Sequence, residues 1–107
     1  AVMAEMAIAE VSHLPTAEQP KILSHYLSHG VYRGIKRKKI LMANSDLMVL
    51  QGKMAINQAV DYLRTGKLNA LQAPDIATID QENIAKQKVG LSLSPSYFKP
   101  IYHVNSQ

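Results

Sequence analysis

A short run of cations is the clearest candidate for chemistry in this sequence. Five basic residues fall within seven positions, directly after a tyrosine: Tyr32, then Arg33, Lys36, Arg37, Lys38 and Lys39. Closely spaced cations neutralise phosphates and release their counterions, and a neighbouring aromatic ring can stack on a base. The run therefore predicts a nucleic-acid contact at 33–39, although a charged surface kept for solubility has the same composition.

The distribution of charge along the chain supports a local binding site rather than an evenly charged surface. The chain has 12 basic and 8 acidic residues, a net charge of +4, and 47% apolar residues among its 107. Such a composition is typical of one globular domain, and the mild positive charge allows nucleic acid or an acidic partner. Because the excess charge is concentrated at 33–39, nucleic acid is the favoured ligand.

The histidines offer a second candidate site. His25 and His29 are four residues apart, so on a helix they share one face and can hold a zinc ion together. A third ligand is needed, and the nearby candidates are His13 and Glu18. No HExxH pattern is present and the chain has no cysteine, so the histidines are interpreted as surface residues and no metal is expected.

Catalytic patterns are weak. Asp75, Asp80 and Glu82 lie close in sequence, but at a predicted helix start, where acidic residues complement the helix dipole. The Arg64–Lys67 segment superficially resembles a phosphate loop and lacks both the upstream glycines and a preceding strand. The sequence therefore predicts a protein that is not an enzyme and needs no cofactor.

Apolar residues at helical spacing predict an all-α fold, a small bundle of about four helices. The expected helices cover residues 1–13, 17–29, 44–64 and about 75–88, with a short or irregular helix within 31–43. Asn44, Ser45 and Asp46 form a strong N-cap cluster for the third of them. Helix 17–29, a turn at Gly30 and a cationic second helix also allow a helix-turn-helix.

The end of the chain changes character. Leu91 and Leu93 alternate with small residues, Pro95 and Pro100 exclude a helix interior, and three of the six aromatic residues follow residue 96. The prediction is a bundle domain over 1–90 and an extended arm over 91–107. Exposed apolar side chains on an arm suit a protein partner or self-association. The predicted partner-binding residues are Leu91, Leu93, Tyr97, Phe98, Ile101 and Tyr102.

Two functions follow from these features. The first is a non-catalytic, oligomeric nucleic-acid-binding protein acting through 33–39. The alternative is an assembly or adaptor subunit of a virion or multi-subunit machine, docking through 91–104. No apolar run approaches the length of a membrane span, so the expected location is soluble and cytoplasmic, or the host-cell interior for a viral protein.

Overall fold

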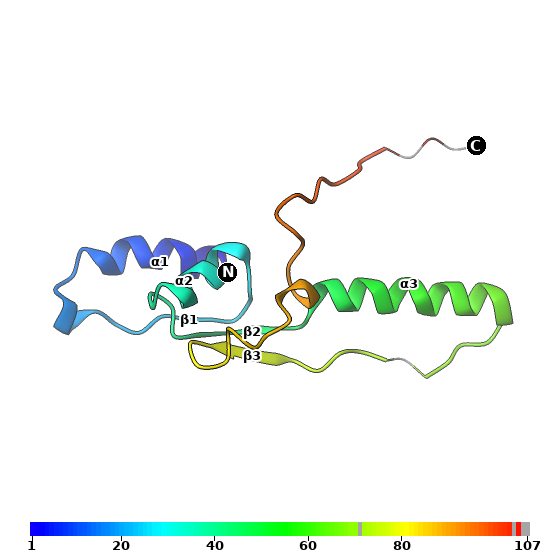
Figure 1. The fold of residues 1–107 in the computed structure, drawn as a ribbon, viewed down its shortest axis with the longest axis horizontal. Helices are drawn as coiled ribbons and strands as arrows, with labels where there is room; N and C mark the ends of the chain where they lie inside the picture. The colour runs from blue at the N-terminus through cyan, green and yellow to red at the C-terminus, as the bar shows by residue number, and fades with distance from the viewer. Residues whose placement is uncertain (71, 104, 106–107) are drawn as a thin grey trace.

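A small mixed sheet, flanked by helices, forms the centre of the structure (Figure 1). The computed structural model describes residues 1–70, 72–103 and 105. Its elements in chain order are α1 (Val2–Ser12), η1 (Thr16–Glu18), β1 (Leu23–Ser24), α2 (His29–Lys36), β2 (Met42–Ser45), α3 (Met48–Thr65), β3 (Ala77–Asp80) and η2 (Val89–Leu91). The prediction of an all-α bundle is therefore wrong, and the fold is α/β.

The sheet is built around β2. Its strand order is β1-β2-β3, with β1 parallel to β2 and β3 antiparallel to it. Helix α2 makes the crossover between the two parallel strands, which is the usual way to connect such strands. The carboxyl ends of β1 and β2 consequently lie at the same edge of the sheet.

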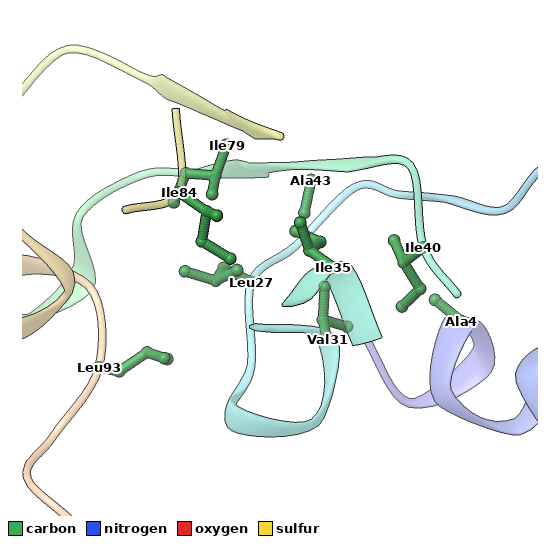
Figure 2. Close-up of a cluster of buried hydrophobic side chains, with 9 residues drawn as sticks. All are labelled: Ala4, Leu27, Val31, Ile35, Ile40, Ala43, Ile79, Ile84 and Leu93. Carbon is green, nitrogen blue, oxygen red and sulfur yellow. The ribbon is translucent and has the colours of Figure 1, made fainter. Parts of the chain in front are cut away.

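The apolar core lies between the sheet and the helices α1 and α2, which Figure 1 shows together on one side of the strands. Figure 2 shows its buried side chains, which come from α1, α2, the strands and the loops: Ala4, Leu27, Val31, Ile35, Ile40, Ala43, Ile79, Ile84 and Leu93. Gly34 permits this packing, because a Cβ there would lie 2.8 Å from Cδ1 of Ile40. The residue that weakened the helix prediction therefore allows α2 to approach its neighbours.

The predicted helix at 17–29 is wrong, and the helix-turn-helix fails with it. Leu23 and Ser24 form β1, with the leucine 61% exposed and the serine buried. Two residues are too few for a period of two to be visible in the sequence. Helix α2 begins only after Ser28, whose Oγ accepts a hydrogen bond from the backbone N of Val31 at 3.0 Å. A short or irregular helix was expected within 31–43. The first part of this range belongs to α2, and its last two residues, Met42 and Ala43, belong to β2.

The long helix is confirmed, but its predicted cap is wrong. Asn44 and Ser45 belong to β2, and α3 starts after Leu47, which has a left-handed backbone with φ 54°. The predicted stop at Gly66 is correct, with φ 69° at that glycine. The first helix, 1–13, is also confirmed by α1.

The last predicted helix, at about 75–88, is wrong. Its first part forms β3, which pairs with β2, and the residues that follow make turns. Asp80 Oδ1 accepts backbone hydrogen bonds from Glu82 and Asn83, both at 2.9 Å, so this acidic residue ends a strand and stabilises a turn. Asp80, expected near the start of a helix, is thus a turn residue.

Helix α3 and the C-terminal segment extend away from the sheet. Figure 1 shows α3 projecting to one side and the C-terminal segment leaving η2 in another direction. No α3 residue is buried, and the molecule measures 60 × 32 × 21 Å. In the described part of the chain, no helix is both long and apolar enough to cross a membrane.

Candidate functional site

Polar side chains follow both parallel strands at the edge where those strands end. His25 and Tyr26 come directly after β1, and Asp46 comes directly after β2. In open α/β sheets, ligands bind beyond the carboxyl ends of the strands. We call Tyr26 and Asp46, with His25 beside them, the polar edge, and we take it as the candidate site.

The two main groups of the polar edge lie within reach of one another. Tyr26 donates its hydroxyl to Oδ2 of Asp46 at 3.5 Å, a long contact for an O–H···O hydrogen bond. The rings of His25 and Tyr26 meet edge to face, with centroids 5.5 Å apart and planes at 86°. Tyr26 is 44% exposed, so the ring and hydroxyl remain open to solvent on one side.

The second carboxylate oxygen of Asp46 has no partner. Its Oδ1 is buried, and no group in the described residues donates a hydrogen bond to it. Buried polar atoms in native proteins nearly always have a partner, and leaving one without costs about 1–3 kcal/mol. The described residues therefore leave the hydrogen-bonding capacity of this oxygen unused.

Hydrogen bonds hold the backbone around Asp46 in place. Ser45 Oγ donates to Ser92 Oγ at 2.7 Å and accepts from the backbone N of Leu47 at 3.1 Å. Gln51 Nε2 donates to the carbonyl oxygen of Asp46 at 2.9 Å. Ser45 at the strand end, Ser92 after η2 and Gln51 in the first turn of α3 thus hold the backbone around Asp46.

The predicted basic residues lie elsewhere, on the last turns of α2 and the loop before β2. Arg33 and Lys36–Lys39 are exposed, and Tyr32 packs partly against the core with Lys36 Nζ 5.2 Å from its ring centroid. The structure thus brings the cations together at the end opposite the polar edge. A groove of about 390 Å³ there is bordered by α1, Lys38 and Lys39.

The histidine pair does not share a helical face. His25 lies in the loop after β1, whereas His29 is the first residue of α2 and its Nε2 lies 2.9 Å from the carbonyl oxygen of Ser94. Within residues 1–70, 72–103 and 105, no group of three potential ligands is placed to hold a metal ion.

The predicted partner-binding residues divide into two groups. Leu93 belongs to the buried core and Leu91 is half-buried in η2. Tyr97, Phe98, Ile101 and Tyr102 are all exposed. Within the predicted arm, Val104 and residues 106–107 lie outside the described residues, and the boundary at residue 90 stays a prediction.

Comparison with known proteins finds sequences and solved structures that are similar to this chain. No family model matches the chain. The solved structure of an ABC transporter solute-binding protein from Bradyrhizobium sp. BTAi1, with bound Bis-Tris, is 36% identical with a TM-score of 0.81, over 96% of this chain and 31% of that one.

A particular relative is the periplasmic protein TorT of Escherichia coli K12, which is 39% identical over 102 residues. TorT in complex with the TorS sensor domain, in the absence of ligand, superposes with a TM-score of 0.84 and 37% identity, over 96% of this chain. A second solved complex of the two proteins was formed in the presence of TMAO. The chain spans only 29% of the length of TorT and 31–35% of the solved chains.

These relatives overturn several predictions. TorT is named a periplasmic protein and is solved in complex with a sensor domain, and the Bradyrhizobium protein is named a solute-binding protein. With relatives of these kinds, the predictions of nucleic-acid binding and of a cytoplasmic location are wrong. The interpretation of residues 33–39 as a nucleic-acid contact loses the function on which it depended. One relative is named for binding a solute, and TorT is solved in complex with a protein partner.

Sequence reasoning missed both main residues of the polar edge. Tyr26 was assigned to a helix and Asp46 to a helix cap. The signal in the sequence is a polar residue three positions after each of two short apolar segments, Ile22–Leu23 and Ile40–Ala43, with a helix between the two segments. This is the pattern of a β-α-β unit. With strands of two and four residues, that pattern is hard to distinguish from a continuous helix.

Proposed function

We propose that this chain forms one wall of the solute site in a periplasmic solute-binding or sensor protein. Tyr26 and Asp46 contact a small polar solute that carries hydroxyl or ammonium donors. The proposal draws on the similarity to TorT and to a solute-binding protein, and on the position of these residues at the carboxyl ends of parallel strands.

The buried, unpartnered Oδ1 of Asp46 is the observation that carries the proposal. A carboxylate oxygen only accepts hydrogen bonds, so the group that satisfies it must donate. Hydrogen bonds to a charged group contribute about 1.5–3 kcal/mol, enough to select one solute over another. The exposed face of the Tyr26 ring adds an apolar or cation-binding surface beside the carboxylate.

Bis-Tris and TMAO, the small molecules named with two of the solved structures, differ in whether they can donate a hydrogen bond. Bis-Tris carries hydroxyl groups and can donate to Oδ1, whereas TMAO has an acceptor oxygen and neither an N–H nor an O–H group. We therefore expect the protein to bind Bis-Tris more tightly than TMAO. Isothermal titration calorimetry with each compound measures the two Kd values, and equal or reversed affinities contradict the donor requirement.

The decisive variant is Asp46→Asn, which keeps the side chain's shape and removes its charge. Loss of a charge-assisted hydrogen bond predicts a Kd for Bis-Tris about 10–100-fold higher. The matched control is Asp61→Asn, the same exchange at an exposed α3 position away from the polar edge. If Asp46→Asn and Asp61→Asn bind Bis-Tris as tightly as the unmodified protein, the polar edge is not the solute site.

A protein partner is the second part of the proposal. TorT forms a complex with the TorS sensor domain, and this chain exposes four large apolar side chains after residue 96. We propose that Tyr97, Phe98, Ile101 and Tyr102 contact a partner of this kind. With the TorS sensor domain as the probe, replacing Tyr97 and Tyr102 by serine is expected to weaken binding at least tenfold, and unchanged binding contradicts this role.

A further inference from the structure

A groove lies at the amino ends of the parallel strands, where the end of α1, the segment before β1 and the loop before β2 meet. Its volume is about 390 Å³, within the range of about 300–1,000 Å³ that is usual for small-molecule sites. Twelve residues line it, roughly half of the 20–30 that one partner contributes to a standard protein–protein interface. The groove therefore has the size of a small-molecule site, and it shares no residue with the polar edge at the carboxyl ends of the same strands.

Three lysines line the groove and make it cationic. Lys21, Lys38 and Lys39 are all exposed, and no aspartate or glutamate is among the described residues that line the groove with them. Like charges held close together repel one another, and an anion placed between them is attracted by all of them. We call this place the lysine groove, and its charge favours an anionic ligand.

The lysine groove also has an apolar lining. Ile8 and Val11 of α1 and Ile22 before β1 are half-buried, and Leu41 is 42% exposed. An inorganic anion leaves these side chains in contact with water, whereas a short hydrocarbon chain covers them. Each methylene group that leaves water raises the affinity about fourfold. The groove thus fits a molecule in which a hydrocarbon chain carries the anionic group.

Lys38 occupies a backbone position that favours glycine. It follows the C-cap residue of α2 and has φ 59°. Its backbone N donates to the carbonyl oxygen of Ile35 at 3.0 Å, and the backbone N of Lys39 donates to that of Gly34 at 2.9 Å, which are the two hydrogen bonds of a Schellman motif. Glycine is the usual residue in this place because an L side chain is strained in the left-handed conformation. A lysine here brings a cation to the groove at a cost in stability.

We propose that the lysine groove binds a small organic anion, a carboxylate or phosphate group on a short hydrocarbon chain. The ammonium groups of the three lysines donate charge-assisted hydrogen bonds to the anionic head, and the chain lies along the apolar lining. Binding here needs neither Tyr26 nor Asp46, so the lysine groove is independent of the proposed solute site.

Titrations of the protein with four compounds test the charge and the chain separately. Hexanoate and hexyl phosphate carry both, acetate carries only the charge, and 1-hexanol carries only the chain. The amide nuclear magnetic resonance shifts of residues 38–41 report the binding. We expect the tighter of the two six-carbon anions to bind roughly tenfold or more tightly than acetate, since it has at least four further methylene groups to bury, and likewise than hexanol, which lacks the charge. That ligand also identifies the anionic head.

Three outcomes of these titrations overturn the proposal. The first is an equal Kd for acetate or hexanol. The second is binding of the six-carbon anions that leaves the amides of residues 38–41 unshifted. The third is tighter binding of an acidic peptide, N-acetyl-Glu-Leu-Glu-Leu-amide, at the same amides, which assigns the groove to a protein partner.

Two lysine variants of equal charge separate the groove from the general positive charge of the protein. Lys39→Gln removes a lining cation and is expected to raise the Kd of the six-carbon anion about 2–5-fold, the size typical of an exposed ion pair. Lys36→Gln is the matched control, because Lys36 belongs to the same basic run but lies near the ring of Tyr32 and does not line the groove. Equal effects of the two variants overturn the proposal.

Lys38→Gly tests the strained position. Glycine relieves the backbone and removes the cation, so we expect a higher midpoint of urea unfolding together with a Kd raised about 2–5-fold. A variant that is more stable and binds the six-carbon anion as tightly as the unmodified protein contradicts the assigned role of Lys38.

Leu41→Ser tests the apolar lining, with Leu23→Ser as the matched control. Both leucines are exposed, at 42% and 61%, and of the two only Leu41 lines the groove. We expect Leu41→Ser to raise the Kd of the six-carbon anion about twofold or more and to leave that of acetate unchanged. Leu23→Ser is expected to change neither. If both serine variants bind the six-carbon anion as the unmodified protein does, the hydrocarbon chain does not lie in the groove.

Discussion

Alanine at position 34 tests how closely α2 approaches its neighbours. Gly34 is buried in α2, and a Cβ added there would lie 2.8 Å from Cδ1 of Ile40, 3.1 Å from its Cγ1 and 3.2 Å from Cδ1 of Ile8. Carbon atoms in contact are ordinarily about 3.5–4.0 Å apart. Ile40 is completely buried, so its side chain has little room to move away.

Two opposing effects determine how much Gly34→Ala changes the free energy of unfolding. Alanine is the better helix former by about 1 kcal/mol, whereas overpacking a dense core costs about 1–3 kcal/mol. We therefore expect Gly34→Ala to lower the free energy of unfolding by about 1 kcal/mol, measured by urea denaturation followed by circular dichroism. Gly52→Ala is the control, since nothing lies within 4 Å of its Cβ position and only the gain in helix propensity remains.

A double-mutant cycle separates the clash from other causes. Ile40→Val removes Cδ1, the atom nearest to the added methyl, and by itself costs about 0.5–1.5 kcal/mol. In the Gly34→Ala background this cost should largely vanish, which gives a coupling energy of at least about 0.5 kcal/mol. The reasoning is refuted if the two changes add within about 0.3 kcal/mol, or if Gly34→Ala is as stabilising as Gly52→Ala.

Three further changes test local features by the same urea measurement. Ser28→Ala removes the cap of α2 and should destabilise by about 1 kcal/mol, whereas a change below about 0.3 kcal/mol contradicts the capping role. Ser92→Ala removes the hydroxyl that accepts from the buried Ser45 and should destabilise by about 1–3 kcal/mol; an unchanged midpoint would mean that water replaces it. Gly66→Ala places a side chain at φ 69° and should reduce the helical signal of α3 by about one turn, which nuclear magnetic resonance shifts of residues 62–65 can verify.

The sequence was sufficient for elements whose stabilising interactions are local. Helix α1 and the body of α3 follow from helix-forming residues and spacing, and the stop at Gly66 follows from its backbone freedom. The sheet was not predictable in this way. β2 contributes four residues and β1 two, and their stability comes from pairing with segments about 20 to 40 positions away.

The polar edge could not be predicted because it depends on that pairing. Asp46 has the composition of a helix cap together with Asn44 and Ser45, and in isolation a cap is the better interpretation. Only the register of β2 between β1 and β3 turns Asn44 and Ser45 into strand residues and places Asp46 beside Tyr26. The basic run at 33–39 led to a wrong prediction for the opposite reason. Its charges are neighbours in the sequence and are seen without any knowledge of the fold, but a cluster of cations alone does not specify nucleic acid as a ligand.

The path of the chain after α3 also limits how the length of this helix can change. Helix α3 has 18 residues and spans about 27 Å, and the 66–76 segment must return over that distance so that Ala77 can pair with Ser45. Fully extended, that segment reaches about 36 Å, so its slack is only two or three residues. A helical turn added to α3 needs about two more residues in the return segment, and deletions there beyond the slack must unwind the helix or shift the register of β3. The lengths of α3 and of the return segment are therefore coupled: lengthening the helix, or shortening the segment beyond its slack, requires a compensating change in the other.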